Sequence, residues 1–425
     1  MTPGRKFQGL WGNVDFRRLW VGMTVSDIGT NMVAVVIPIM AAVELGASAF
    51  EIGVISAVEF MPYILVSLFV GAWLDKRAKR PIIVLADVVR AVALLLIPVA
   101  WWTDALTVPG LIGIVFVIGL CSMVSDIGGA SILPSLVRRG ELIEANSKLE
   151  ISSSVSNIGG TTIGGIVIQV LSAPMVALLG VVTSLLAAFS TFRISKRDER
   201  PGKGEESILK EMSGGLKFVF GQISVRTLAI TSFLINFFAF VIEPVFLLFI
   251  TRTLALPPFL IGIVMAMTGI GSLVGALLAE RVSALMPLGK LLLAVSAAIG
   301  INALLVPLAV LTARPLAVAL VIFSQFSYAV LVIIANVNVR SYRTALTPDE
   351  LQGRMNASVR MLVMSGAPVG ALLGGALGSL IGTAWALTAG AVGLLTVPVV
   401  IALSPVARVR SATGSETAAP PAEVK

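Results

Sequence analysis

Long runs of apolar residues, separated by shorter polar connections, make up most of the chain. A helix needs about 20 apolar residues to cross the hydrocarbon core of a bilayer, and twelve runs approach or exceed this length. We therefore predict an all-α membrane protein with twelve transmembrane helices. The predicted spans cover residues 18–44, 51–73, 82–102, 109–135, 149–171, 174–193, 227–250, 258–279, 289–311, 315–339, 357–381 and 383–403.

The composition indicates that lipid is the main solvent of the chain. Of its 425 residues, 57% are hydrophobic and 13% are charged, whereas about a quarter of the residues in a soluble domain are charged. So few charges do not cover a water-facing surface of this size. The 40 glycines are also typical of transmembrane helices that pack closely against one another.

The lysines and arginines are concentrated on one side of the predicted membrane. All but three of the 31 fall in alternate connections or in the two tails, and the exceptions are Arg90 within a span and Arg252 and Arg314 on the other side. Because basic connections remain in the cytoplasm, we predict that both termini are cytoplasmic. The net charge of +8 then faces anionic lipid headgroups, and no nucleic-acid partner is expected.

Missing residue types exclude several functions. The chain has no histidine and one cysteine, Cys121, within an apolar run. A histidine-ligated metal, a catalytic triad with histidine, an intrachain disulfide and a cysteine metal cluster are therefore excluded. The sequence also contains no Gly-x-x-x-x-Gly-Lys-Ser/Thr loop for nucleotide phosphates. We predict no metal, no cofactor and no enzymatic activity.

The two halves of the chain share sequence features at nearly constant separation. A duplicated six-helix half is typical of transporters, whose substrate site lies near the bilayer midplane at the interface of the repeats. The matching features are Phe50-Glu-Ile-Gly-Val with Phe259-Leu-Ile-Gly-Ile, Glu141-Leu with Glu350-Leu, and Asn146 with Asn356.

Three glycines follow each of these asparagines at the same spacing. The first lies fourteen residues on, and a Gly-Gly pair begins four residues later. Glycines four residues apart share one helix face and allow another backbone to approach, so we predict surfaces of close helix packing. These glycines are Gly160, Gly164, Gly165, Gly370, Gly374 and Gly375.

The repeat divides the chain into four predicted segments. Residues 1–194 form an N-terminal six-helix half, and residues 226–410 form a C-terminal six-helix half. Between them, residues 195–225 form a polar cytoplasmic linker, within which Ile208–Phe220 is expected to form a short amphipathic helix. Residues 411–425 have the composition of a disordered tail. The predicted fold is therefore two pseudo-symmetric six-helix bundles.

The connection between the second and third spans carries the motif Gly71-Ala-Trp-Leu-Asp-Lys-Arg-Ala-Lys-Arg80. Together with twelve spans in two halves, it resembles the signature of the major facilitator superfamily, a glycine followed by an aspartate four residues on and then a basic cluster. Ala78 stands in the place of a glycine, and Trp73 in the place of a leucine. The resemblance implies a conformational latch. Its residues are Gly71, Asp75, Lys76, Arg77, Lys79 and Arg80.

Further motifs resemble a narrower bacterial group, which contains macrolide-efflux and enterobactin-export proteins. The resemblance covers nearly the whole chain, and it implies export across a bacterial inner (plasma) membrane. Gly160-Thr-Thr-Ile-Gly-Gly is similar to the glycine motif of family exporters, but Thr161 replaces a proline, so this helix should be less kinked. The motifs of the narrower group are Phe16-Arg-Arg-Leu-Trp, Ser26-Asp-Ile-Gly, Leu133-Pro, Glu141-Leu and Ala145-Asn146.

Polar and acidic residues lie on shared faces of several predicted spans. A charged side chain costs about 2.5–3.5 kcal/mol at the centre of a span, so we expect the acidic ones to face the bundle interior or a water-filled cavity. Functionally, one or more would exchange a proton during transport. Structurally, a carboxylate would instead pair with Arg90, and Asp87 on the same helix is its simplest partner. The candidate residues for proton coupling or the substrate cavity are Asp27, Asn31, Glu59, Tyr63, Asp126, Asn236, Glu243, Gln325, Tyr328 and Asn336.

The predicted function is secondary active export of small amphiphilic organic molecules, such as drugs, antibiotics or siderophores, coupled to protons through alternating access. The expected partners are the small-molecule substrate, protons and membrane lipids, and the protein is expected to be a monomer. A lipid or lysolipid flippase is the main alternative. Less favoured alternatives are a divalent-metal exporter with oxygen ligands and a nontransporting membrane sensor.

Overall fold

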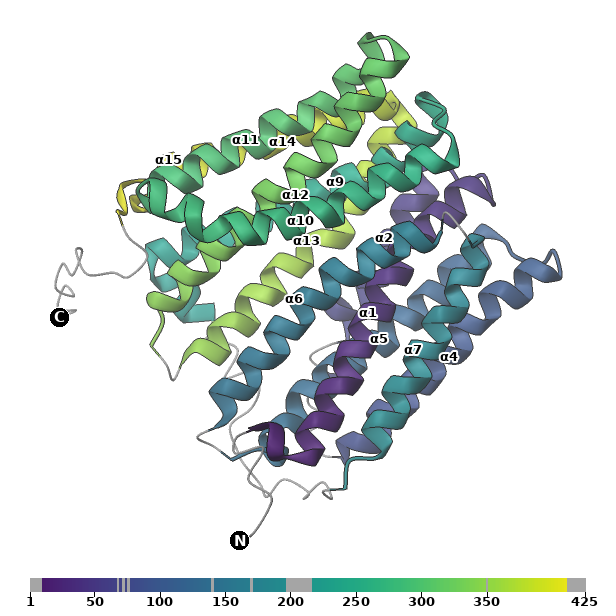
Figure 1. The fold of residues 1–425 in the computed structure, drawn as a ribbon, viewed down its shortest axis with the longest axis vertical. Coiled ribbons are helices and arrows are strands. Elements are labelled where there is room, and N and C mark those ends of the chain that lie inside the picture. Colours follow the sequence, from purple (N-terminus) through teal and green to yellow (C-terminus); the bar gives the residue numbers. More distant parts are fainter. Residues whose placement is uncertain are drawn as a thin grey trace, which may run out of the picture. The chain divides into compact units, whose positions relative to one another are not determined.

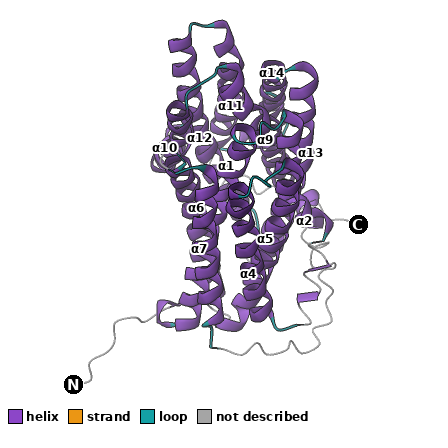
Figure 2. Cartoon of the chain, turned by 90° about the vertical axis from the view of Figure 1, so that its right-hand side faces the viewer, coloured by secondary structure: helices purple, strands orange, loops and turns teal. Residues whose placement is uncertain are grey.

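The structure, a computed structural model, describes residues 10–66, 69–70, 73–74, 77–138, 141–168, 171–195, 216–348 and 351–410. Throughout these residues the regular structure is helical, as Figure 2 shows. The chain divides into two compact units. Unit 1 comprises residues 1–208 and 250–266, and unit 2 comprises residues 209–249 and 267–425. Residues 250–266 lie in the predicted C-terminal half but belong to unit 1.

Among its described residues, unit 1 contains six whole long helices, a short N-terminal one and the start of α10 (Pro258–Leu285) up to Ala266. At the start of the first long helix, the side chain of Asn13 accepts hydrogen bonds from the backbone N–H groups of Asp15 and Phe16. At the start of the second, Ser48 forms a capping box with Glu51. These polar caps satisfy backbone donors that a helix leaves unpaired at its start. The helices are η1 (Leu10–Gly12), α1 (Val14–Val43), α2 (Ala49–Leu65), α4 (Lys79–Trp102), α5 (Val108–Leu136), α6 (Leu142–Val167) and α7 (Ala173–Phe192).

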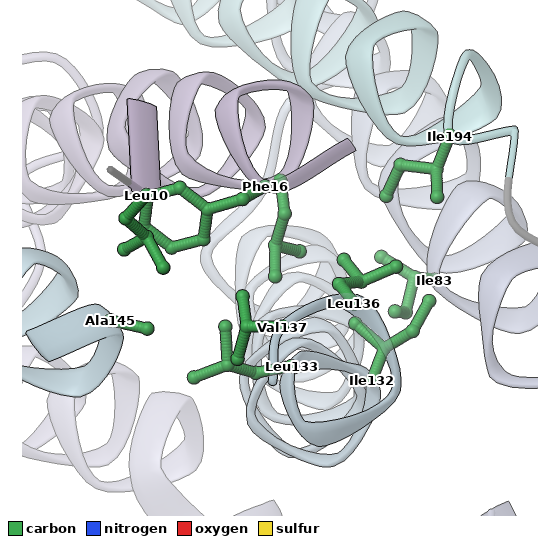
Figure 3. Packing of buried hydrophobic residues seen from close by; sticks show 10 residues of the cluster. Leu10, Phe16, Ile83, Ile132, Leu133, Leu136, Val137, Ala145 and Ile194 are labelled. Carbon is green, nitrogen blue, oxygen red and sulfur yellow. The ribbon is translucent and has the colours of Figure 1, made fainter. Parts of the chain in front are cut away.

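Neighbouring helices of unit 1 pack along their lengths. Helix α1 packs against α6 and α7, α4 against α5 and α7, and α2 against α5 (Figure 1). At the N-terminal end of α1, buried apolar side chains from several helices form one cluster, shown in Figure 3. The cluster consists of Leu10, Phe16, Leu19, Ile83, Ile132, Leu133, Leu136, Val137, Ala145 and Ile194.

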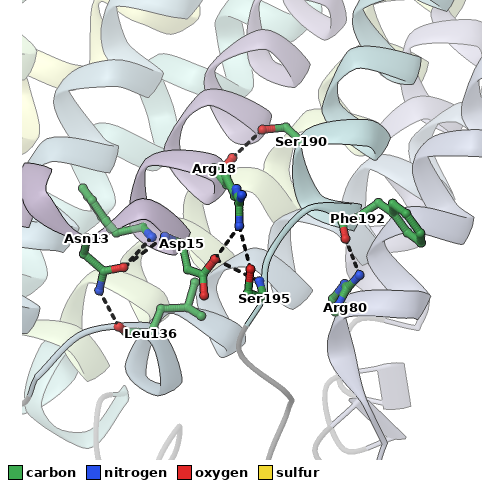
Figure 4. Close-up of polar contacts among 9 residues, drawn as sticks. Asn13, Asp15, Arg18, Arg80, Leu136, Ser190, Phe192 and Ser195 are labelled. Atoms are coloured by element: carbon green, nitrogen blue, oxygen red, sulfur yellow. Dashed lines mark hydrogen bonds and ion pairs between the residues drawn. The ribbon is translucent and has the colours of Figure 1, made fainter.

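Polar contacts fix the same end of α1 (Figure 4). Asn13 donates a hydrogen bond to the Leu136 carbonyl at 2.7 Å. Asp15 accepts hydrogen bonds from Arg18 at 3.0 Å and from the backbone of Ser195 at 2.9 Å. Ser190 of α7 donates to the Arg18 carbonyl at 2.7 Å. Because these bonds link the start of α1 to the ends of α5 and α7, they hold three helices in register.

Unit 2 repeats this arrangement with its own helices. Helix α9 packs against α13 and α14, and α11 packs against α12 and α14. Its helices are α9 (Ile223–Leu248), α11 (Leu288–Leu308), η4 (Ala309–Leu311), α12 (Arg314–Ala345), α13 (Gln352–Ile381), α14 (Thr383–Leu394), α15 (Thr396–Ala402) and η6 (Pro405–Arg408), and α10 (Pro258–Leu285) contributes its residues from Met267 onward. The π-helical turn η3 (Phe249–Thr253) follows α9.

Ten helical segments in the described part of the chain are long and apolar enough to cross a membrane. They correspond to ten of the twelve predicted spans. The other two predicted spans fall on α2 and α6. The described part of α2 has 17 residues, fewer than the roughly 20 that span a bilayer. Within α6, Ser152, Ser153, Ser156 and Asn157 lower the mean hydropathy.

Two predicted segments lie largely outside the described residues. In the linker, residues 216–221 are helical, and residues 196–215 are outside the description. The predicted tail, residues 411–425, is also outside it.

Candidate functional site

A chain of amides joins α1 to α6 within unit 1. Asn31 donates a hydrogen bond to the backbone carbonyl of Asp27, one turn earlier in α1, at 2.7 Å. The amide oxygen of Asn31 accepts a hydrogen bond from Asn157 of α6 at 2.9 Å. The side chain of Asp27 is half-buried. The polar face predicted for α1 is thus directed at least partly toward α6.

Close backbone contact between α1 and α6 depends on two glycines. A Cβ atom at Gly160 would lie 2.6 Å from the Ile28 carbonyl oxygen, and one at Gly164 would lie 2.9 Å from the Met32 carbonyl oxygen. A Cβ atom and a backbone carbonyl oxygen cannot approach each other this closely. Only glycine therefore fits at these positions without moving the helices apart. Gly165, the residue after Gly164, faces Met265, which also belongs to unit 1.

Unit 2 has the same contact between α9 and α13. A Cβ atom at Gly370 would lie 2.5 Å from the Phe237 carbonyl oxygen, and one at Gly374 would collide with the carbonyl of Val241. In each unit the two glycines lie four residues apart and face two carbonyls that are also four residues apart. The sequence repeat therefore corresponds to a repeated helix contact. Gly375 is buried as well.

Two predicted site residues, from different helices, meet inside unit 1. Tyr63 of α2 donates a hydrogen bond to the carboxylate of Asp126 of α5 at 2.6 Å. Glu59 lies one turn before Tyr63 on α2, so both side chains share one face of this helix. All three side chains are half-buried. The polar face predicted for α2 is directed toward α5 at Tyr63.

The predicted pair of Asp87 and Arg90 is confirmed, and it is almost completely buried. The two residues are each 2% exposed, and Nη2 of Arg90 lies 3.0 Å from Oδ1 of Asp87. The same carboxylate oxygen accepts a hydrogen bond from Ser125 of α5 at 2.9 Å. Arg90 also donates to hydroxyl groups of α1, α5 and α7. These acceptors are Ser26 at 2.7 Å, Ser184 at 3.1 Å, Thr30 at 3.4 Å and Ser122 at 3.4 Å.

This shell of hydroxyl groups was not predicted from the sequence, although it leaves a signal there. Ser26 and Thr30 are four residues apart on α1, and Ser122 and Ser125 are three apart on α5, so each pair lies on one helix face. A buried guanidinium needs acceptors for its five donors. Paired hydroxyls at helical spacing on neighbouring spans indicate where those acceptors lie.

A small cavity adjoins the ion pair. Its volume is about 10 Å³, which is room for about one water molecule. Every residue that lines it belongs to unit 1. The lining residues are Gly29, Thr30, Val33, Ile37, Glu59, Arg90, Leu94, Val115, Ile118 and Ser184.

Two of the predicted polar residues of unit 2, Glu243 and Tyr328, lie close enough for an electrostatic interaction. Glu243 of α9 is accessible to solvent, although the surrounding protein partly desolvates its carboxyl, and its charge acts on Tyr328 of α12. Asn236 donates a hydrogen bond within its own helix to the Ser232 carbonyl at 3.3 Å. On α12, Gln325 is half-buried and Asn336 is exposed.

One buried polar network of unit 2, between α11 and α12, is uncharged. Asn302 of α11 donates to the Ser324 carbonyl of α12 at 2.9 Å and accepts a hydrogen bond from Ser327 at 2.6 Å. Asn302 is 6% exposed and Ser324 is 1% exposed. This network joins α11 to α12 as the Asp87 and Arg90 network joins α4 to α5. At the separation of about 209 residues that relates the two halves, Asn302 corresponds to Ala93, about one turn after Arg90.

Half of the predicted latch can be located. Gly71, Asp75 and Lys76 lie outside the described residues. Arg77 lies over the ring of Trp73, with 5.7 Å between the guanidinium carbon and the ring centroid. Lys79 donates a hydrogen bond to the Ser131 carbonyl at 3.2 Å, and Arg80 donates one to the carbonyl of Phe192. These two cations link the start of α4 to α5 and α7.

A second ion pair lies outside the spans, between α5 and α6. The side chain and the backbone N–H of Arg138 donate hydrogen bonds to Glu141, and they hold the pKa of this carboxyl below its ordinary value. The guanidinium is 88% exposed, and exposed ion pairs contribute little to stability. We assign it no part in the site.

The helical architecture, with buried charges inside apolar helices, defines a membrane transporter. A family model described as the Major Facilitator Superfamily matches residues 19–343, and the chain belongs to this family. It is a transporter and not an enzyme. The multidrug efflux pump Tap of Mycolicibacterium fortuitum is 26% identical over 347 residues, which are 78% of this chain and 81% of that protein.

Solved transporter structures share the fold. A bacterial homologue of the iron transporter ferroportin, in an inward-facing state, superposes with a TM-score of 0.69 at 14% identity, covering 93% of this chain and 99% of the other. The nucleoside transporter NupG superposes with a TM-score of 0.67 at 12% identity, covering 91% and 98%. Identities this low support the fold and do not identify a substrate.

Proposed function

We propose that the protein is a secondary active exporter of small amphiphilic organic molecules, driven by the proton gradient across a bacterial inner membrane. In this proposal twelve helices span the membrane, both termini are cytoplasmic, and the protein acts as a monomer. The two repeats rock against each other, so that the substrate site opens first to one side of the membrane and then to the other.

The main support for proton coupling is the set of charged groups inside the spans of unit 1. A buried ion pair is a poor stabiliser, because desolvation of the two charges offsets most of their attraction. The Asp87 and Arg90 pair lies on the apolar helix α4, and Asp126 and Glu59 lie on the neighbouring helices α5 and α2. Ionisable residues within spans typically mark ion or proton pathways.

The corresponding network of unit 2 gives an internal comparison. Asn302, Ser324 and Ser327 join the same pair of helices in the repeat without any charge. In the described part of unit 2, this pair of helices is thus joined by uncharged side chains, one turn away from the position that corresponds to Arg90. The ionisable groups of unit 1 fit a role in transport better than a role in packing alone.

The substrate class is supported by the similarity to the Tap protein, a multidrug efflux pump. The predicted site residues include carboxylates and aromatic side chains, notably Glu243 and Tyr328. Such residues suit a lipophilic cation, because carboxylates attract its charge and aromatic faces bind both its apolar surface and its charge. We therefore expect amphiphilic cations among the exported molecules.

A transport assay tests this function. The protein is produced in a bacterial strain without its own efflux pumps, and the accumulation of lipophilic dyes and antibiotics is measured with and without a protonophore. We expect lower accumulation, which the protonophore and the Asp27→Asn variant both abolish. The matched control is Asp104→Asn, which removes the same charge from the exposed connection after α4 and should export normally.

Other outcomes separate the parts of the proposal. Export that is insensitive to the protonophore would contradict proton coupling. Export that survives Asp27→Asn would remove Asp27 from the mechanism and leave Glu59, Asp126 and Glu243 as candidates. Unchanged accumulation of every compound, with the protein present in the membrane, would contradict broad export and favour a lipid substrate.

A further inference from the structure

An open groove lies between the start of α9 and the end of α12, within unit 2. Its volume is about 480 Å³, and small-molecule sites typically have volumes of about 300–1,000 Å³. Every residue that lines it belongs to unit 2, and none of them is among the residues predicted for transport. The lining residues are Lys217, Phe218, Gly221, Gln222, Leu346 and Pro348.

The apolar wall of the groove is held by packing. Phe218 and Leu346 are half-buried, and both pack against one cluster of buried apolar side chains from α9 and α13. Beside them, a Cβ atom at Gly221 would meet no atom within 4 Å. The groove therefore combines a firm apolar wall with open space at Gly221.

Two polar side chains line the groove next to this wall. Lys217 is exposed and is the one charged residue among those that line it. Gln222 stands at the N-cap position of α9. Within the described part of the chain, its side chain makes no capping hydrogen bond and its buried amide oxygen meets no donor. A buried acceptor without a donor is costly, so a ligand that supplies a donor is favoured here.

The residues around the groove suit a membrane surface. Phe220 and Ile223, which flank the groove residues in the chain, are exposed large apolar side chains. Arg226 is exposed and lies four residues after Gln222, on the same face of α9. In the proposed topology this end of α9 lies at the cytoplasmic membrane surface, where basic residues attract anionic lipids. A phospholipid is therefore the occupant that matches both the apolar and the basic side chains.

The polar groups also select among lipid headgroups. None of the described residues that line the groove is acidic, and Asp349 and Glu350, which follow Pro348 in the chain, lie outside the description. An ammonium headgroup, as in phosphatidylethanolamine, therefore finds no carboxylate among these lining residues. A glycerol headgroup instead offers hydroxyl donors to the amide oxygen of Gln222, and its phosphate offers an anion to Lys217.

We propose that this groove binds one phosphatidylglycerol molecule of the membrane. The ammonium group of Lys217 pairs with the phosphate, and Phe218 and Leu346 contact the start of an acyl chain. The terminal torsion of Gln222 is free to turn, which brings its amide oxygen to a headgroup hydroxyl. Because the groove joins the start of α9 to the end of α12, the bound lipid stabilises the contact between these two helix ends. This site is independent of the proposed transport mechanism.

The test measures lipid binding by the purified full-length protein in detergent. Native mass spectrometry gives the affinities for phosphatidylglycerol, phosphatidylethanolamine and glycerophosphate, which carries the headgroup chemistry without acyl chains. We expect the wild type to bind phosphatidylglycerol more tightly than the other two. Lys217→Gln should bind it about five-fold more weakly, the contribution of one basic residue near a membrane surface. Gly221→Leu should weaken binding at least as much, because the new side chain fills the open space.

Two variants are matched controls. Lys290→Gln removes the same charge from an exposed position near the start of α11 in unit 2. Gly113→Leu adds the same side chain on α5 of unit 1, where a Cβ atom also meets no atom within 4 Å. Both should bind phosphatidylglycerol as the wild type does. Thermal unfolding without added lipid should give the wild-type midpoint for every variant, and phosphatidylglycerol should raise the midpoint of the wild type more than that of Lys217→Gln.

Three results would overturn the site. One is equal affinity of the wild type and Lys217→Gln for phosphatidylglycerol, and another is an equal loss in Lys290→Gln, which would show diffuse attraction to a basic surface. The third is equal affinity of the wild type for phosphatidylglycerol and phosphatidylethanolamine. Binding of glycerophosphate as tight as that of the lipid would assign the groove to a free phosphate compound instead. These measurements involve no transport, so their failure would leave the proposed export function intact.

Discussion

Tyr63 of α2 donates a hydrogen bond of 2.6 Å to the carboxylate of Asp126 of α5. The two residues are 63 positions apart in the chain, and the distance between the two oxygens lies in the usual range for an O–H donor. It fixes the distance between two helices at the place where each carries a polar face. A bond of this kind can serve packing, proton transfer or both, and two substitutions separate these roles.

Replacing Tyr63 by phenylalanine should weaken the contact between α2 and α5. It removes a hydrogen bond, which typically contributes about 0.5–1.5 kcal/mol, and the ring remains to fill the space. We expect a lower thermal unfolding midpoint in detergent, measured by the intrinsic fluorescence of tryptophan. Asp126→Asn keeps an oxygen that accepts from Tyr63, so its midpoint should fall less.

The transport readout completes this comparison. If Asp126 exchanges a proton, Asp126→Asn should lose pH-dependent export even though its stability is nearly normal. Equal export by Asp126→Asn and the wild type at every pH would show that the bond serves packing only. Tyr63→Phe should export more slowly, with a pH dependence that is still present.

The repeated glycine contacts predict matched losses of stability in the two units. Gly160→Ala would place a Cβ atom 2.6 Å from the Ile28 carbonyl oxygen, and Gly370→Ala would place one 2.5 Å from the Phe237 carbonyl oxygen. A backbone carbonyl cannot turn aside as a flexible side chain does, so the helices must separate. Overpacking of this kind costs about 1–3 kcal/mol.

Gly159→Ala is the control for these two variants, because a Cβ atom at Gly159 meets no atom within 4 Å. Alanine favours a helix over glycine by up to about 1 kcal/mol, so this variant should unfold at the same temperature as the wild type or slightly higher. If Gly160→Ala is as stable as Gly159→Ala, the helices are not in close contact there. Thermal unfolding in detergent provides all three values.

Much of the architecture follows from local sequence patterns. Apolar runs of spanning length identify ten spans directly, and the recurring glycines identify equivalent helix contacts in the two units, since both signals lie within single helices. The pair of Asp87 and Arg90 is also predictable, because residues three apart on a helix are neighbours. These features need no knowledge of which helices are adjacent.

Contacts between helices are harder to predict. Ser26 and Ser184 become partners of Arg90 only because α1 and α7 lie within reach of its side chain, and serines are common in spans for other reasons. Tyr63 and Asp126 were both candidates, but no pattern paired them. Their pairing depends on the rotation of two helices about their axes, which side-chain packing along the whole helix determines.

The uncharged network of unit 2 predicts a change in stability without a change in pH dependence. Asn302→Ala removes the amide that bonds to Ser324 and Ser327, and loss of buried hydrogen-bond partners costs about 1–3 kcal/mol. Ser296→Ala is the control on the same helix, since the Ser296 hydroxyl donates its hydrogen bond to the Leu293 carbonyl, one turn earlier in that helix. Thermal unfolding should rank Asn302→Ala below Ser296→Ala.

Export by both variants should keep the wild-type pH profile, because neither change involves an ionisable group. A shifted profile in Asn302→Ala would mean that this network takes part in proton coupling despite its neutrality.

Arg252, in the part of unit 1 that follows α9, binds the connection between α1 and α2 (residues 44–48), which we call the α1–α2 corner. It donates a hydrogen bond to the Ala47 carbonyl at 2.7 Å and a longer one to the Ala42 carbonyl at 3.4 Å. Its charge also acts on Glu51, which forms the capping box at the start of α2 with Ser48. Backbone carbonyls carry no sequence signal, so this contact was not foreseen.

Removing this cation should loosen the corner. Ala47 is 1% exposed, so the thiol of Ala47→Cys should react slowly with a membrane-impermeant maleimide added to intact cells. The background is Cys121→Ala, which removes the one native thiol. Adding Arg252→Ala should raise the labelling rate several-fold, because the Ala47 carbonyl loses its strongest donor and the chain between the helices can open.

Arg314→Ala removes the same charge in unit 2 and should leave the rate unchanged. Equal labelling with and without Arg252 would show that the α1–α2 corner is held by its own helix caps. Labelling only after cell lysis would place the corner in the cytoplasm and contradict the predicted orientation.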